Sequence, residues 1–124
     1  MFMQEHLLDF EVVQSDTKTW RFTAKHHGQP LNLTGYEFFF TVKKLIKDPD
    51  SRAVIAKHIT CANDAESIAG HAFISLSSTE SNIPLGNYMY DIKMQLKING
   101  NIVSRKTVAI GSFRVNATGT ARVN

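Results

Sequence analysis

The run Ile83–Met94 constrains the fold of this chain more than any other stretch. Pro84 and Gly86 predict a turn, because proline fixes its φ and glycine tolerates positive φ. Apolar and polar side chains then alternate over Tyr88–Ile98, which is the period of a strand with one buried and one wet face. Asn99-Gly100 follows and predicts a tight hairpin turn into a further strand.

Tyr88 follows Gly86 by two residues at the start of this long strand. The arrangement is typical of the tyrosine corner of immunoglobulin-like sandwiches, in which the ring packs into the core and the hydroxyl bonds to upstream backbone. Tyr90 shares the inward face of the strand, so Gly86, Tyr88 and Tyr90 are predicted to form a structural corner. Such a corner fixes a fold and carries out no chemistry. We therefore expect the sequence to indicate architecture better than activity.

Short strands with frequent turn signals fill the chain, without βαβ spacing or a long helix. The strands expected besides Tyr88–Ile98 are Leu7–Val13, Thr19–Lys25, Tyr36–Lys44, Ala53–Ile59, His71–Ser77, Ile102–Ile110 and Ser112–Val115. The first two are joined so briefly that they form either a hairpin or a strand that switches sheets. Gly111 is predicted to make a bulge between the last two.

The pattern predicts an all-β fold, an immunoglobulin-like antiparallel β-sandwich of about seven or eight strands over residues 1–115. Residues 116–124 are small and polar and are expected to form a short tail. Ala53–Ile59 is the weakest strand and is placed near a sheet edge. Thr60–Gly70 is interpreted as a loop, with a helical turn as an open alternative. The predicted core consists of Trp20, Phe22, Phe38, Phe40, Ile74, Tyr88, Tyr90 and Ile92.

Composition fits one globular domain: the 124 residues are 43% hydrophobic and 20% charged. The net charge of +3 is scattered, with Lys43-Lys44 and Arg105-Lys106 the only adjacent basic pairs, so no nucleic-acid partner is expected. Cys61 is the only cysteine, which rules out an intrachain disulfide and fits a reducing compartment or a virus particle assembled in one. Neither a signal peptide nor a membrane-length apolar run is found, so no membrane partner is expected.

No arrangement of residues typical of catalysis or metal binding stands out, and we expect no enzyme activity, cofactor or metal. The chain has no Gly-x-Ser-x-Gly elbow and no glycine-rich phosphate loop. His58 and Cys61 have a His-x-x-Cys spacing, but no second pair completes a zinc site, and Cys61 is interpreted as a small apolar side chain. His26 and His27 are adjacent, so on an extended chain their rings would diverge.

Phe39, Phe73 and Met89 fall at the outward phase of their strands, and Val13 is a further candidate for this group. One interpretation is that these strands are buried on both faces, or that the phase is wrong at a bulge. The other is a contiguous apolar patch on which another subunit docks. Under this second interpretation, the candidate interface consists of Phe39, Phe73 and Met89.

Several motifs occur in an order that resembles the immunoglobulin-like domain at the N-terminus of phage baseplate upper proteins, and similar small phage tail and baseplate proteins. The resemblance covers residues 7–115 and departs from the family where the chain stops after a short tail. Val108–Gly111 is also less characteristic than the other motifs. Those motifs are Leu33-Thr34-Gly35-Tyr36, Phe38–Lys44, Gly70–Leu76, Ser78–Asn82, Ile83–Ile92 and Ile110–Val115.

This resemblance implies a non-enzymatic structural component of a tailed phage or prophage particle, in the baseplate or tail. The protein would be assembled in the bacterial cytoplasm and would reside in the virion. Its partners would be other phage structural proteins, and symmetric rings make a homo-oligomer a further expectation.

A carbohydrate-binding module is the alternative from a different functional class. Sugar sites use exposed aromatic platforms, and the candidates are Tyr36, Phe39 and Trp20. Trp20 shares a face with Phe22 and Ala24, which favours burial over display.

Overall fold

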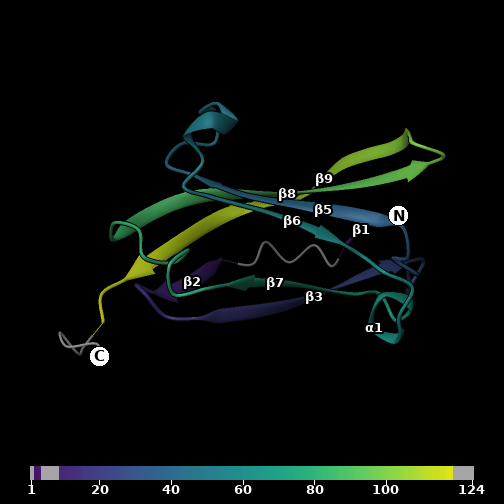
Figure 1. Cartoon of the computed structure of the whole chain (residues 1–124), viewed down its shortest axis with the longest axis horizontal. Helices are drawn as coiled ribbons and strands as arrows, with labels where there is room; N and C mark the ends of the chain where they lie inside the picture. The colour runs from purple at the N-terminus through teal and green to yellow at the C-terminus, as the bar shows by residue number, and fades with distance from the viewer. Residues whose placement is uncertain (1, 4–8, 119–124) are drawn as a thin grey trace.

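The computed structural model describes residues 2–3 and 9–118, which form two β-sheets packed face to face (Figure 1). This confirms the predicted all-β sandwich. One sheet has five strands in the order β2 (Phe10–Val13), β9 (Asn101–Asn116), β8 (Gly86–Ile98), β5 (Tyr36–Lys43) and β6 (Ile55–Thr60). The other has four strands, and those are β1 (Phe2–Met3), β3 (Lys18–His26), β4 (Gln29–Pro30) and β7 (His71–Leu76).

The sandwich is not entirely antiparallel, which corrects the sequence-based prediction. β2 runs parallel to β9, with Phe10 opposite Phe113, whereas every other pairing among the described strands is antiparallel. The connection from β2 to β3 crosses from the five-stranded sheet to the four-stranded sheet, so β2 pairs with β9 and forms no hairpin with β3. Of the two alternatives for this connection, the sheet switch is therefore the observed one.

The core lies between the two sheets, and all the predicted core residues except Trp20 are buried. Trp20 is half-buried and stacks on Phe10, with ring centroids 4.9 Å apart. Phe10 stacks in turn on Tyr90 at 4.6 Å. Each large apolar side chain taken out of water in this way contributes roughly 1.5–3 kcal/mol.

Two predictions about the periphery are confirmed. β6 lies at the edge of the five-stranded sheet, where the weakest strand was expected. The loop before β7 contains a single helical turn, α1 (Ala65–Ile68), whose N-terminus is capped by Asp64 accepting a hydrogen bond from the Ser67 N–H at 2.8 Å. The other helical segment, η1 (Asp50–Arg52), rises above the outer face of the five-stranded sheet between β5 and β6 (Figure 1).

The bulge predicted at Gly111 is wrong. Gly111 lies within the continuous strand β9 and pairs with Tyr90, and a Cβ at this position would lie 2.8 Å from the Tyr90 ring carbon Cε1. Glycine is therefore needed because an aromatic ring covers the backbone. The register shifts of β8 and β9 fall elsewhere, and Val103 and Val108 are the extra residues of β9 at those points.

Candidate functional site

The residues of the predicted corner hold the fold together. The Tyr88 hydroxyl donates a hydrogen bond to the carbonyl oxygen of Pro84 at 2.6 Å. Gly86 has a φ of 139°, which side chains rarely permit. Tyr88 and Tyr90 are both buried, and the pKa of each phenol is raised by this burial. These features anchor the start of β8.

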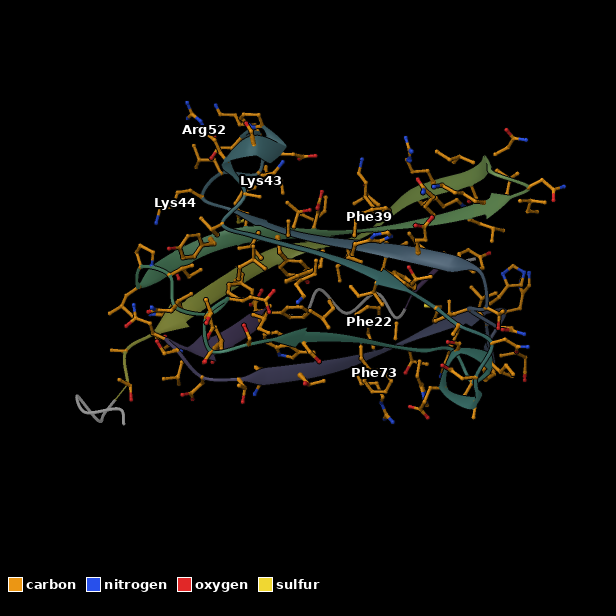
Figure 2. The ribbon with its side chains drawn as sticks, viewed as in Figure 1. Phe22, Phe39, Lys43, Lys44, Arg52 and Phe73 are labelled. Atoms are coloured by element: carbon orange, nitrogen blue, oxygen red, sulfur yellow. The ribbon has the colours of Figure 1, made fainter. Side chains whose placement is uncertain are left out.

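The candidate interface residues do not form one patch, which corrects the sequence-based expectation. Phe39 lies on the outer face of the five-stranded sheet and Phe73 on the outer face of the four-stranded sheet, with Phe22 between the layers (Figure 2). Met89 shares the outer face with Phe39, but the two residues lie at different heights along the strands. Met89 is opposite Lys43, four residues beyond Phe39 on β5, whereas Phe39 is opposite Lys93. All three side chains point outward as predicted, but Phe73 lies on the opposite surface of the sandwich from Phe39 and Met89.

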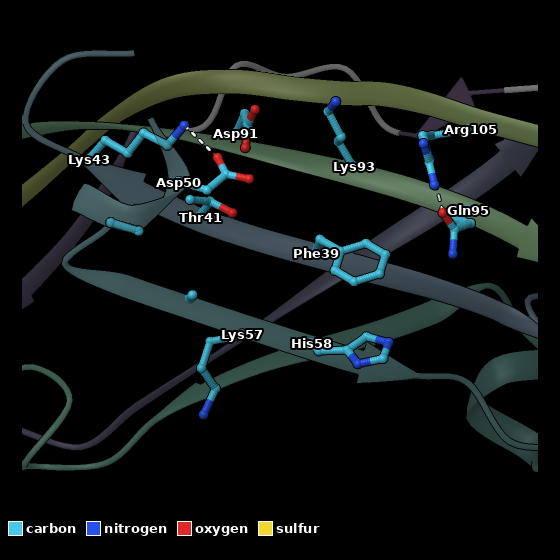
Figure 3. Close-up of a pocket in the computed structure, with 12 residues that line it drawn as sticks. Phe39, Thr41, Lys43, Asp50, Lys57, His58, Asp91, Lys93, Gln95 and Arg105 are labelled. Carbon is cyan, nitrogen blue, oxygen red and sulfur yellow. Dashed lines mark hydrogen bonds and ion pairs between the residues drawn. The ribbon is translucent and has the colours of Figure 1, made fainter. Parts of the chain in front are cut away.

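The outer face of the five-stranded sheet contains a groove of about 500 Å³, which we call the outer groove (Figure 3). Asp50 of η1 lies at one end and Arg105 of β9 lines the other. The Phe39 ring of β5 lies on its floor and stacks on the His58 ring of β6, with centroids 4.6 Å apart and an angle of 7° between the planes.

A chain of hydrogen bonds crosses the sheet beside this aromatic pair. The Glu37 carboxylate lies 2.7 Å from His58 Nε2 and 3.1 Å from Gln95 Nε2. Gln95 Oε1 in turn accepts a hydrogen bond from Arg105 Nε at 2.9 Å (Figure 3). The chain thus joins β6, β5, β8 and β9. Hydrogen bonds from Gln95 and His58 hold the pKa of Glu37 below its usual value. The polar groups at this end of the groove are therefore held in fixed positions.

The opposite end is held by Lys43. Its ammonium lies 2.7 Å from the carboxylate of Asp50 and donates to the carbonyl oxygen of Asp48 at 2.8 Å. The hydrogen bond from Lys43 lowers the pKa of Asp50. Because Lys43 belongs to β5, these contacts fix the η1 segment against the sheet and shape that wall of the groove.

Asp91 stands in the groove between these two clusters (Figure 3). Burial raises the pKa of this half-buried carboxyl, although Lys43 and Lys93 act in the opposite direction. Within the described part of the chain, no hydrogen bond or ion pair to its carboxylate is found. Asp91 therefore presents an acceptor that an incoming donor can satisfy.

The histidines and the cysteine do not come together. His58 faces the groove, whereas Cys61 is buried and burial raises the pKa of its thiol, so it lacks the thiolate character of a nucleophile. The His26 and His27 rings do not diverge but contact each other at 4.1 Å, because His27 occupies a turn with a φ of 51°. Over residues 2–3 and 9–118, no cluster of three or more His, Cys, Asp or Glu side chains could hold a metal ion.

Sequence reasoning missed the groove because its residues come from different strands. Alternation correctly places Glu37 and Asp91 on the outer face, but only the register puts Glu37 opposite Gln95 and Asp91 opposite Thr41. Gln95 itself is 4% exposed, although its position in the alternation predicts a wet side chain. One sequence feature could have indicated the groove: neighbouring strands carry oppositely charged and amide side chains at positions that face outward.

A two-sheet sandwich of this kind also occurs in a known phage protein. The fold is similar to that of a solved structure described as the N-terminal domain of phage TP901-1 ORF48, with a TM-score of 0.56 and 12% sequence identity. The match covers 87% of this chain and 84% of the other. No protein-family model matches the sequence, and the search of curated proteins also gives no match. No helix in the described residues is long and apolar enough to cross a membrane.

Proposed function

We propose that this protein is a non-enzymatic structural component of a tailed phage or prophage particle, in the baseplate or tail, that binds neighbouring particle proteins through its sandwich. The observation that carries the proposal is the fold shared with a domain of a phage protein over most of both chains. The order of motifs over residues 7–115, which resembles phage baseplate proteins, supports it independently. The particle would be assembled in the bacterial cytoplasm, and repeated copies of the chain would fit a symmetric particle.

The outer groove is the surface we assign to this binding. Its hydrogen-bond donors and acceptors are already fixed by Glu37, Gln95 and Lys43, so a partner would meet ordered groups at low entropic cost. Phe39 and His58 add a flat aromatic surface, and Asp91 offers an acceptor without a direct partner among the described residues. This combination suits recognition of another protein.

The proposal is tested by mass spectrometry of gradient-purified particles induced from the source bacterium. We expect peptides of this chain at a stoichiometry that matches other tail proteins. Detection in the cell lysate only would refute the virion assignment.

The surface assignment is tested with Phe39→Glu combined with Met89→Glu, which should leave the unfolding midpoint unchanged and abolish incorporation. Phe73→Glu is the matched control, because Phe73 is 37% exposed on the opposite sheet. Normal incorporation of the double variant, or equal loss in the control, would show that this face does not bind the neighbour.

A carbohydrate-binding module is the second candidate, and the stacked pair of Phe39 and His58 beside fixed polar groups favours it. Trp20 is not displayed as a platform, because it stacks on Phe10 and meets the edge of Phe113 at 6.1 Å. A glycan array with the wild type and Phe39→Ala tests this candidate. Binding that the substitution removes would favour the module, and the absence of any glycan signal would eliminate it.

A further inference from the structure

The turn between β8 and β9 extends beyond the rest of the sheet. β5 pairs with β8 only as far as Tyr36 opposite Leu96, and beyond that point β8 and β9 pair with each other alone. Figure 1 shows this hairpin projecting past the ends of β5 and β6. We call residues 97–106 the hairpin arm. Residues 97–103 form its free tip, whereas residues 104–106 at its base pair with Leu96, Gln95 and Met94, which also pair with β5.

The arm exposes apolar side chains that the sandwich does not cover. Ile98 is 54% exposed, Ile102 47% and Val103 54%. Lys97 pairs with Ile102 and Ile98 pairs with Asn101, so the two isoleucines lie on opposite faces of the ribbon. An isolated two-stranded ribbon gains little from such residues in water, because it has no core in which to bury them. Their position favours burial against a second molecule.

The arm is also uniformly basic. It carries Lys97, Arg105 and Lys106, and no Asp or Glu follows Asp91 anywhere in the sequence. Lys97 lies 3.8 Å from Glu37 at the base of the arm, and Arg105 donates to Gln95. No hydrogen bond or ion pair of Lys106 is found in the described residues. A docking surface for this arm must therefore be acidic around an apolar centre.

The edge of β9 is unsuited to the addition of a further strand. The extra residues Val103 and Val108 are bulges that interrupt the hydrogen-bond ladder of β9, and Lys106 projects from its exposed stretch. Bulges and edge lysines both disfavour the pairing of a further strand. The arm would therefore bind through its side chains rather than its backbone. Nucleic acid is a poorer occupant, because the sequence contains no aromatic residue between Tyr90 and Phe113 to stack on bases.

We infer that the hairpin arm docks on an acidic, apolar-centred surface of a neighbouring protein in the particle. The arm would enter a cleft of that surface, where Ile98 on one face of the ribbon and Ile102 on the other supply the apolar contacts. The basic residues would set the orientation of the arm and the sensitivity of the contact to salt. This inference rests on the proposed function, and it assigns a second contact beside the outer groove.

Photo-cross-linking within the particle tests the inference. The full chain is supplied in trans to the induced lysogen with p-benzoyl-phenylalanine in place of Ile102 or, as a control, in place of Phe73. We expect the arm position to cross-link to an Asp/Glu-rich segment of another particle protein, with a yield that falls as salt is raised. A cross-link to DNA, to a surface without acidic residues, or none at all from particles that contain the protein would overturn the inference.

A charge-reversal pair provides the second measurement. Lys106→Glu should reduce incorporation about tenfold, whereas Lys25→Glu, an exposed lysine of β3, should not. Both variants should keep the wild-type unfolding midpoint. Equal incorporation of the two would refute the arm contact and leave the proposed function standing. If the wild-type chain itself is missing from the particles, the proposed function fails and the arm contact fails with it.

Discussion

β8 and β9 each pass through two regions of the molecule that differ sharply. In one region they lie between neighbouring strands and face the four-stranded sheet, where Tyr90 is 1% exposed and Phe113 is fully buried. At the tip of the hairpin arm, over residues 97–103, the same strands have no third strand beside them, and Ile98 is 54% exposed. Tyr90 and Ile98 have the same phase on β8. Alternation therefore tells which way a side chain points, and the opposing layer decides whether it is buried.

The comparison separates residues that hold the fold from residues available for binding. The buried half is stabilised by stacked rings and close backbone contacts, so changes there should cost stability. The arm has few such contacts and should open locally at little cost. Matched substitutions in the two regions test this distinction.

Truncation of a buried ring should produce the largest effect. Phe113→Ala removes a fully buried ring that packs against Phe40 and Trp20, and it should lower the free energy of unfolding by about 3–5 kcal/mol. Ile102→Ala in the arm should change it by less than about 0.5 kcal/mol. Urea denaturation of both variants measures the difference. Similar losses would mean that the arm is packed as tightly as the core.

Substitution of a glycine should distinguish the two regions next. Gly111→Ala places a Cβ 2.8 Å from the Tyr90 ring and should cost about 1–3 kcal/mol, because Tyr90 is held by its neighbours. Gly100 in the arm has a φ of 80° and nothing within 4 Å of an added Cβ, so Gly100→Asn should cost only the backbone strain of a side chain at positive φ, about 1 kcal/mol or less, since asparagine tolerates this conformation. Thermal unfolding compares the two. A neutral Gly111→Ala would show that the Tyr90 ring can move aside.

Sequence alone could predict most of the layers and the inward faces. Turn residues and alternation are local, so the Pro84 corner, the buried phase of β7 and the edge position of β6 follow from short stretches of chain. The pairing of β2 with β9 could not be predicted, because it joins residues such as Phe10 and Phe113 that are distant in the chain. The role of Gly111 likewise depends on a ring that arrives from the neighbouring strand.

The candidate site was less predictable than the fold. Phe39, Phe73 and Met89 were correctly assigned to outer faces, but sequence cannot assign a face to a particular sheet, and the sheet decides whether two outward residues meet. The outer groove depends on register across four strands and on the position of η1, which Lys43 fixes through Asp50. Both are long-range properties.

Removal of the Tyr88 hydroxyl should have a smaller effect than either core change. Tyr88→Phe keeps the buried ring but deletes the 2.6 Å hydrogen bond to Pro84, and it should lower the free energy of unfolding by about 1 kcal/mol. Tyr36→Phe is the control, because no hydrogen bond of its hydroxyl is found within the described residues. An unchanged urea midpoint for Tyr88→Phe would show that the hydrogen bond of the corner does not stabilise the fold.

The smallest expected effect concerns the ion pair that ties the two sheets at one edge. Lys57 of β6 lies 2.7 Å from Glu80, which follows β7, and hydrogen bonds from Lys57 and from the Ser77 backbone hold the pKa of Glu80 below its usual value. Because the folded-state pKa is the lower one, this stabilisation is complete above the unfolded-state pKa and is lost as the pH falls through the folded-state value.

Glu80→Gln should therefore cost at most about 1 kcal/mol at pH 7, since the pair is partly exposed, and the difference from wild type should disappear in acid. Urea midpoints measured across the acid range test this, with Glu11→Gln on β2 as a control, because Glu11 is an exposed carboxylate with no ion pair among the described residues. If the urea midpoints of wild type and Glu80→Gln still differ at the lowest pH, the effect comes from the packing of the side chain and not from its charge. The arm lacks such a tie to the opposite sheet among the described residues, so Lys106→Gln should leave the same profile unchanged.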